Sequence, residues 1–361
     1  MSGPQTTSDT VAAAPPTGEP GSKPSLATTL ERLSLGRYAG VLVALIGVAI
    51  YLTITQGSFL TWDNMKNIIG ANSVILVLAL GATLVVITAG IDLSTASLMT
   101  ACSMMLAIAF KSGWGLVPAV LLALAFGSAA GLMNGVLIAR AKISFLAVTL
   151  GALSIWQSFA LVVQEGQTVS IFSVKAFDPI HELVTNDIGP IPLLLIFDLI
   201  LVVLFGGLLR YTTFGRSLFA IGSNEEAARL SGINVAAVLI GVYTIAGLAA
   251  GLACMVSVGR LTAGSPTPDP NLLLTVLAAV LIGGTSFTGG VGGILGTVIG
   301  VVFLGVVQNG MTLSNISSFW QGIVSGSILI IAVGLGVLRD RGWSLRRARG
   351  ASAAVTEGPV G

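Results

Sequence analysis

Long apolar runs separated by short polar segments make up most of the chain. A helix that crosses the hydrocarbon core of a bilayer needs about 20 residues, and about ten such spans would account for the apolar content. We expect one helix from each run: 38–53, 74–89, 97–110, 116–139, 145–163, 191–209, 238–258, 272–282, 291–307 and 319–338. The pattern predicts an all-α, polytopic membrane protein with about ten transmembrane helices.

Composition supports this class and narrows the chemistry. Of the 361 residues 54% are hydrophobic and only 9% are charged, against roughly 25% charged in soluble proteins. The net charge of +2 is too small for a nucleic-acid binder. Cys102, Cys254 and the single His181 cannot form a metal site or a Cys/His nucleophile, which disfavours an intramembrane enzyme, and His181 is expected in a solvated loop. No phosphate-binding loop occurs, so any ATP must bind to another subunit.

The basic residues indicate an orientation. A ten-span arrangement with both termini in the cytoplasm places thirteen of the 17 Lys and Arg residues inside, as the positive-inside rule requires. The segment 164–190, in which acidic residues outnumber basic ones, then lies outside. We divide the chain into a flexible cytoplasmic tail (1–37), a transmembrane domain (38–338) with a cytoplasmic loop at 210–237, and a basic cytoplasmic tail (339–361), and we expect it in the cytoplasmic membrane.

Glycines interrupt the helical pattern near the C-terminus. The run 272–282 is too short to cross a bilayer alone. Either the glycine-rich stretch after it completes the span, or this run and the next form a re-entrant pair. The density of glycine in 283–293 predicts a break or tight turn, whereas Gly296 and Gly300 have the spacing of a helix-packing pair.

Two carboxylates lie at or inside apolar runs. A charge at the centre of a membrane helix costs about 2.5–3.5 kcal/mol on insertion scales, so each needs a compensating role. Asp92 is placed either to cap the next helix or to act in transport, and Asp198 is either protonated or locally paired, or acts in transport. These residues motivate an alternative function, a proton-coupled secondary transporter of a small polar solute.

The cytoplasmic loop carries the sharpest local signal. Ser223 followed by Glu226 has the spacing of a capping box, Glu225 and Glu226 suit the positive end of a helix dipole, and Gly232 is a stop signal. We therefore expect a short capped helix of about two turns. It is either an ordinary surface helix or one that a partner protein holds, since so short a helix is marginal alone.

The residues of this loop resemble a known family. The sequence TFGR at 213–216 followed by AIGSNEEAARLSGIN at 220–234 is similar to the coupling loop of the membrane subunit of ribose/xylose-type ABC sugar importers. Three further stretches resemble the same family: GIDLS at 90–94, NGVLIA at 134–139, and GGTS at 283–286 continuing through Gly289 and Gly290 to Asn309, Gly310 and Gln321. The four motifs occur in order from about the first span to the last.

The resemblance implies a non-catalytic permease that translocates a simple sugar or polyol. It implies a second permease copy or a paralogue, an extracytoplasmic binding protein, and a cytoplasmic ATPase that holds ATP and Mg, with membrane lipid around the spans and no cofactor or metal on this chain. The residues expected to contact the ATPase are Arg216, Ser223, Asn224, Glu225, Glu226, Ala227, Ala228, Arg229 and Gly232. Candidates for the translocation pathway are Asn72, Asp92, Ser94, Asn134, Gln157, Thr285, Ser286, Asn309 and Gln321, because a polyol that loses its water needs donors and acceptors along its path.

The chain departs from the family pattern at several positions. Ala89 replaces a usual glycine, Ser223 stands in a usual Gly-Gly-Asn, and Val291 replaces a usual arginine. Leu273 and Thr275 replace a common acidic pair. The loss of that acidic pair affects which pattern of hydroxyl groups a transported sugar can have, but it does not affect the predicted fold.

Overall fold

The computed structural model describes residues 38–317, 319–331 and 334. The predicted tails at 1–37 and 339–361 lie outside the described residues. The helices that correspond to apolar runs are α2 (Ala39–Thr55), α3 (Trp62–Ile87), α4 (Thr95–Lys111), α5 (Leu116–Ala139), α6 (Phe145–Val162), α8 (Leu193–Tyr211), α11 (Val235–Leu261), α12 (Leu272–Ile282), α13 (Ile294–Leu313) and a helix over Phe319–Ile331. Six of these are long and apolar enough to cross a membrane by length and composition, and four are shorter. The predicted all-α membrane architecture is confirmed.

Helix α3 lies at the centre of the packed helices. Every residue from Val77 to Ile87 is buried, and α11, α13, α12 and α8 all contact this helix. Helix α11 also packs along α5, where Gly127 and Gly131 face Gly247 so closely that an added Cβ would meet the opposite backbone. Small residues allow this approach in lipid, where apolar burial gives no drive for helices to associate.

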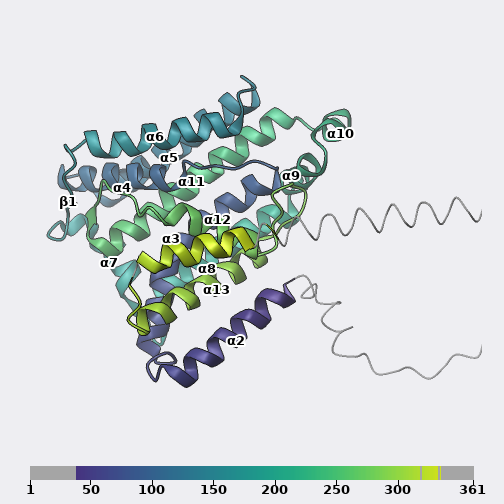
Figure 1. Cartoon of the computed structure of the whole chain (residues 1–361). Helices are drawn as coiled ribbons and strands as arrows, with labels where there is room; N and C mark the ends of the chain where they lie inside the picture. Colours follow the sequence, from purple (N-terminus) through teal and green to yellow (C-terminus); the bar gives the residue numbers. More distant parts are fainter. Residues whose placement is uncertain (1–37, 318, 332–333, 335–361) are drawn as a thin grey trace, which may run out of the picture. The chain divides into compact units, whose positions relative to one another are not determined.

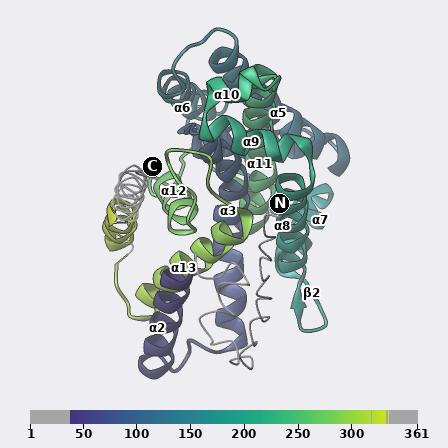
Figure 2. The same cartoon turned by 90° about the vertical axis from the view of Figure 1, so that its right-hand side faces the viewer.

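The two ends of the bundle carry different small elements (Figure 1). At one end lie α9 (Thr213–Ser223) and α10 (Glu225–Leu230). At the other end lie β1 (Val169–Ser170), η2 (Lys175–Phe177) and α7 (Asp178–Thr185), with the hairpin of β2 (Asp187–Ile188) and β3 (Ile191–Pro192). Figure 2 looks onto the first end, with α9 and α10 in front.

The segment 164–190, predicted to lie outside, is tied to the helix ends. Strand β1 pairs antiparallel with β4 (Ala263–Gly264), which follows α11. His181 of α7 is half-buried, and its Nδ1 lies 3.1 Å from the Gly259 carbonyl oxygen. The expected solvated histidine is thus a packing contact, because α7 folds back onto the end of α11.

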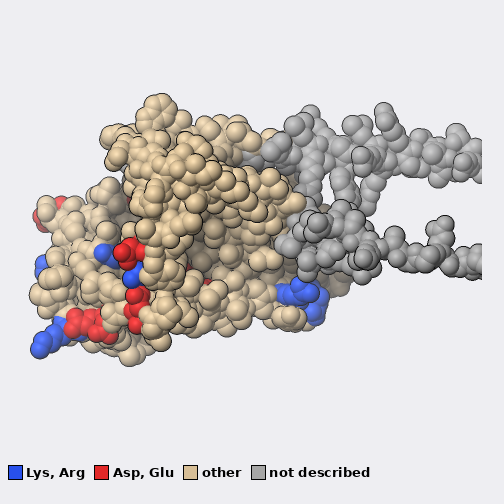
Figure 3. Space-filling view, turned by 90° about the horizontal axis from the view of Figure 1, so that it is seen from below, with Lys and Arg blue, Asp and Glu red and all other residues tan. Residues whose placement is uncertain are grey.

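Charged side chains gather toward the two ends of the face seen in Figure 3, with mostly uncharged side chains between them. A body embedded in lipid needs such an uncharged band, because charge at bilayer depth is costly.

In the structure the eighth run forms a short helix, α12, which ends at the glycine-rich stretch. The stretch 283–293 is not helical, so it does not lengthen α12. Helix α13 packs along α3: Thr297 lies 2.6 Å from Thr83, and Asn309 exchanges hydrogen bonds with Asn64. At 1.5 Å per residue, α12 is about 16 Å long. Helix α12 alone is therefore too short to cross a bilayer, as the length of its run predicts.

The predicted packing role of Gly296 and Gly300 is confirmed. Gly296 lies against the Gly283 backbone, and Gly300 lies against the Ala279 carbonyl oxygen. The two glycines join α13 closely to α12.

Candidate functional site

The segment from α9 to the start of α11 folds through three side-chain caps. The Thr212 hydroxyl accepts from the Gly215 amide at 3.0 Å, the side-chain oxygen Oδ1 of Asn224 accepts from the Ala227 amide at 2.9 Å, and Oδ1 of Asn234 accepts from the Ala237 amide at 3.0 Å. Thr and Asn satisfy helix-terminal amides in this way. Each of three consecutive helices thus begins at a residue suited to start it.

The expected capping box at Ser223 and Glu226 is wrong by one position. Ser223 is the last residue of α9, while Asn224 has the extended backbone of an N-cap, with φ −165°. Glu226 does not return to the cap; it forms an ion pair with Arg229. The predicted short helix is confirmed, but its cap is Asn224.

Gly232 ends α10 as predicted. Its φ is +85°, a conformation that glycine adopts at little cost. The Gly232 amide donates to the Arg229 carbonyl oxygen at 3.0 Å, and the Ile233 amide donates to that of Ala228 at 3.1 Å. This pair of bonds is the Schellman pattern, which satisfies the last carbonyls of a helix.

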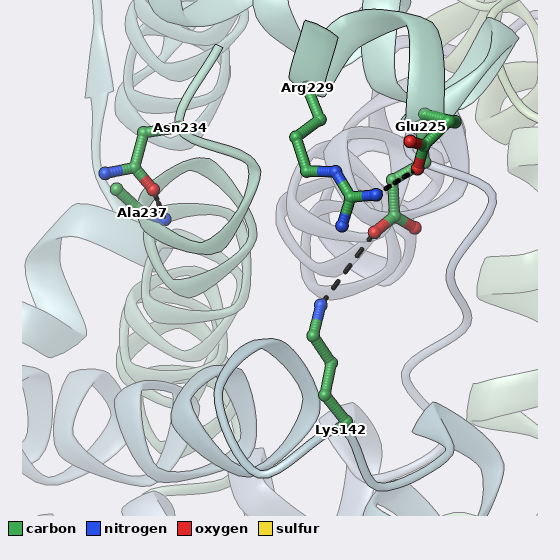
Figure 4. A network of polar contacts seen from close by, with 6 residues as sticks. Lys142, Glu225, Arg229, Asn234 and Ala237 are labelled. Atoms are coloured by element: carbon green, nitrogen blue, oxygen red, sulfur yellow. Dashed lines mark hydrogen bonds and ion pairs between the residues drawn. The ribbon is translucent and has the colours of Figure 1, made fainter. Parts of the chain in front are cut away.

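Helix α10 presents most of its side chains to solvent. Glu225, Glu226 and Arg229 are exposed, whereas Ala228 is buried against Ile221 and Val235. Figure 4 shows Lys142, from the loop after α5, reaching toward Glu225, and the two charged groups lie 4.0 Å apart. The Glu226 carboxylate raises the pKa of the Arg229 guanidinium above its usual value by hydrogen bonding and charge.

Leu230 is a feature of this surface that the sequence analysis missed. Its side chain is 80% exposed on an otherwise polar helix. Arg216 of α9 is exposed as well, so both helices offer accessible side chains. The sequence does contain a signal for the exposure of Leu230. Leu230 lies two positions after Ala228, and helix residues two positions apart do not share a face.

The end of α9 touches the core of the bundle through backbone atoms. A Cβ added at Gly222 would meet the Ile87 carbonyl oxygen and the Gly290 amide nitrogen. The Gly290 amide itself donates to the Ile87 carbonyl oxygen at 2.9 Å. We call this contact of Gly222, Ile87 and Gly290 the glycine junction. It links the α9–α10 element to the end of α3 and to the loop between α12 and α13.

Three predicted pathway residues form one buried group near the start of α4. The Asp92 carboxylate accepts from the Ser94 amide at 2.9 Å and from the Ser94 hydroxyl at 2.6 Å. Asn134 of α5 donates to the Ser94 hydroxyl oxygen at 3.1 Å. The side-chain oxygen Oδ1 of Asn134 and the Tyr243 hydroxyl are buried without a partner among the described residues. Asp92 therefore has a local partner, but it does not cap α4, because the N-cap residue of α4 is Ser94 and no side chain accepts from the first amides of the helix.

Asp198, the second carboxylate, also has a local partner. It is buried in α8 and accepts a hydrogen bond from the Ser73 hydroxyl of α3 at 2.7 Å. This contact ties two helices together.

The other pathway candidates are dispersed. Asn72 packs against Gly305 and Asn309 pairs with Asn64, all between α3 and α13. Thr285 is buried, and Ser286 shares a 2.8 Å hydrogen bond with Thr288 in the loop before α13. Gln157 is exposed on α6, and Gln321 is half-buried on the last described helix.

A cavity with both polar and apolar lining lies elsewhere, among α3, α4, α11 and α13 and beside the segment that precedes α12. Its volume is about 410 Å³, within the roughly 300–1,000 Å³ typical of small-molecule sites. None of the nine predicted pathway residues lines it. Its polar lining includes Ser257, Arg260, Ser265, Thr267, Asp269 and Gln308. These residues come from separate elements, so no short motif marks them in the sequence.

Comparisons with known proteins show to which protein family the chain belongs. A family model described as the permease component of branched-chain amino acid transport systems matches residues 64–333. The chain belongs to this permease family. It is a multi-pass membrane protein and a transport component, not an enzyme.

The permease is also similar to individual sugar permeases. It is 35% identical to the ribose import permease protein RbsC of Bacillus subtilis (strain 168) over 303 residues, which cover 83% of this chain and 91% of the relative. It is 36% identical to the L-arabinose transport system permease protein AraH of Escherichia coli (strain K12) over 295 residues, covering 81% and 88%. It is 34% identical to the probable ABC transporter permease protein y4mJ of Sinorhizobium fredii (strain NBRC 101917 / NGR234) over 297 residues, covering 81% and 87%.

These matches favour the ABC permease interpretation over proton-coupled transport. No solved structure matches the chain.

Proposed function

We propose that the permease is the translocation subunit of an ABC importer for a neutral simple sugar or polyol. The observation that carries the proposal is its identity of about 35% over most of its length to permeases named for ribose and arabinose. The family model is named for branched-chain amino acids, and the sugar assignment rests on the nearer resemblance of the individual permeases.

The ATPase docks, in this proposal, on α9 and α10. Their exposed charged side chains and the exposed Leu230 suit a protein partner better than lipid. ATP and Mg bind to the ATPase, and both termini of the permease lie on the same cytoplasmic side. A binding protein delivers sugar at the opposite end, which carries α7 and the β2–β3 hairpin, and a second permease copy or a paralogue completes the membrane unit.

The glycine junction provides the route by which docking acts on the spans. A displacement of Gly222 is transmitted at van der Waals contact to Ile87 and Gly290. Packed backbones have no flexible side chain between them to absorb such a shift. Movement of α9 therefore moves the loop between α12 and α13, which is the type of rigid-body change that switches transporters.

Reconstitution tests the function. Proteoliposomes that contain the permease, its ATPase and its binding protein are expected to accumulate labelled D-ribose or L-arabinose only with ATP. Protonophores are expected to leave this uptake unchanged. Uptake of L-leucine in place of both sugars would contradict the substrate class. Uptake by the permease alone under a proton gradient would contradict ATP-driven import.

A further inference from the structure

The cavity among α3, α4, α11 and α13 carries an inference that rests on the proposed function. Its walls come from the parts of α11 and α13 near Arg260 and Gln308 and from the segment around Asp269. Strand β4 holds that segment by pairing with β1 and by packing Gly264 on the Ser103 carbonyl oxygen of α4. The cavity therefore lies at the end opposite α9 and α10, where sugar is delivered in the proposed importer.

Several polar groups that line the cavity are not used by the fold. In the described part of the chain, the side chains of Ser257, Arg260 and Gln308 make no hydrogen bond. One Asp269 oxygen accepts from the Asn271 amide at 2.8 Å, which leaves the second oxygen without a hydrogen-bond partner among these residues. A guanidinium donates, a carboxylate accepts and an amide does both. Together they match the alternating donors and acceptors of sugar hydroxyls.

The charged residues of the cavity distinguish neutral sugars from charged ones. Arg260 and Asp269 have opposite charges, and no ion pair within 4.0 Å joins them in the described residues. Their charges cancel over the site, which favours a neutral solute over a phosphorylated one. Val74, Ile75, Met99 and Leu272 add apolar lining suited to the C–H face of a sugar ring.

We propose that this cavity is a transit site for a neutral sugar, with Arg260, Asp269 and Gln308 as its hydrogen-bonding residues. The site holds the sugar after its release by the binding protein and before passage toward α12. Lining from both polar and apolar groups, without an aromatic stacking surface among the cavity residues, suits brief occupancy.

Cysteine labelling tests the site without the ATPase. Native Cys102 and Cys254 are buried, so Ser257→Cys supplies an accessible thiol in the full chain held in nanodiscs. We expect a charged methanethiosulfonate reagent to label Ser257→Cys, and D-ribose or L-arabinose at millimolar concentration to slow the labelling several-fold. Ribose 5-phosphate is expected to have no such effect. Phe172→Cys, at a side chain 75% exposed outside the cavity, is the control and should be insensitive to sugar.

Three results would overturn the transit site. They are failure of Ser257→Cys to react, reaction unchanged by either sugar, and equal slowing of Phe172→Cys. Each leaves ATP-driven uptake by the wild-type importer intact, so failure of this site is distinguishable from failure of the proposed function.

A charge substitution provides a second measurement. Asp269→Asn keeps an oxygen for the Asn271 amide but removes the negative charge. In the reconstituted importer we expect KM for sugar to rise about ten-fold with little change in maximal rate, as for a lost hydrogen bond to a charged group. Asp63→Asn, at a carboxylate whose side chain is 93% exposed, is the matched control. Equal KM values for the two variants would contradict a role of Asp269 in binding.

Discussion

Single residues determine where the cytoplasmic element begins and how closely it approaches the spans. Asn224 starts α10 by accepting from the Ala227 amide. Helix α10 has only six residues, so it has little internal hydrogen bonding to compensate for a lost cap. The cap therefore controls the shape of the surface proposed for the ATPase.

Asn224→Ala tests the position of the cap. We expect the loss of about 1 kcal/mol of local stability, as is typical of an N-cap, and so roughly five-fold faster amide exchange over residues 225–231. Ser223→Ala is the control, since Ser223 lies inside α9 and caps nothing. Hydrogen–deuterium exchange by mass spectrometry measures both. Faster exchange in Ser223→Ala than in Asn224→Ala would restore the capping box that the structure contradicts.

Gly222→Ala tests the glycine junction. The added methyl group meets backbone atoms of Ile87 and Gly290, which cannot rotate away. Overpacking of this kind costs about 1–3 kcal/mol, so we expect a lower midpoint of thermal unfolding and weaker ATP-driven uptake. Gly206→Ala, in α8 where nothing lies within 4 Å, should resemble the wild type in both measurements. Wild-type behaviour of Gly222→Ala would show that the contact is loose.

At the scale of elements, α3 is held to its neighbours by buried polar pairs. Ser73 bonds to Asp198 of α8, Thr83 to Thr297 of α13, and Asn64 to Asn309 of α13. Interhelical hydrogen bonds in membranes contribute about 0.6 kcal/mol on average. The pairs therefore fix the register of α3 more than they add to its stability.

Asp198→Asn separates a structural role from proton transport. The asparagine carbonyl oxygen still accepts from the Ser73 hydroxyl, so we expect near wild-type unfolding and ATP-driven uptake. Asp198→Leu leaves that hydroxyl unpaired and should lower stability by about 1 kcal/mol. Measurement of uptake and of thermal unfolding distinguishes the two variants. Abolished uptake in Asp198→Asn with unchanged unfolding would revive a proton-carrying role.

The sequence anticipates most elements because apolar length is a strong signal. The observed α5 and α12 have the predicted bounds. Helix α3 begins at Trp62, twelve residues before its apolar run, because Asn64 and Lys66 find partners in Asn309 and Asp187. Those partners are distant in the sequence, so the hydropathy pattern contains no sign of them.

The candidate sites are less predictable. The helix at α10 follows from local residue types, but Ser223 and Asn224 are both good caps, and the tertiary contact of Gly222 decides between them. The cavity depends on Arg260 and Asp269, which come together only after the segment before α12 folds in beside the helices. No local spacing encodes that arrangement.

At the scale of the whole molecule, the two candidate sites occupy opposite ends of the bundle. The α9–α10 element contacts the end of α3 and the loop before α13 through the glycine junction, and α12 and α13 join that loop to the cavity lined by Leu272 and Gln308. A continuous set of packed backbones therefore connects the proposed ATPase surface to the proposed sugar site. The central claim is that a separate ATPase drives the permease by engaging α10 from the cytoplasm.

Site-specific photocrosslinking in the assembled importer tests this claim most directly. A benzophenone amino acid replaces Leu230 on α10 in one variant and Phe172 at the opposite end in the other, both exposed apolar positions. The account predicts a crosslink from position 230 to the ATPase and none from position 172. A crosslink to the ATPase from position 172 in place of position 230 would contradict both the docking surface and the orientation of the permease.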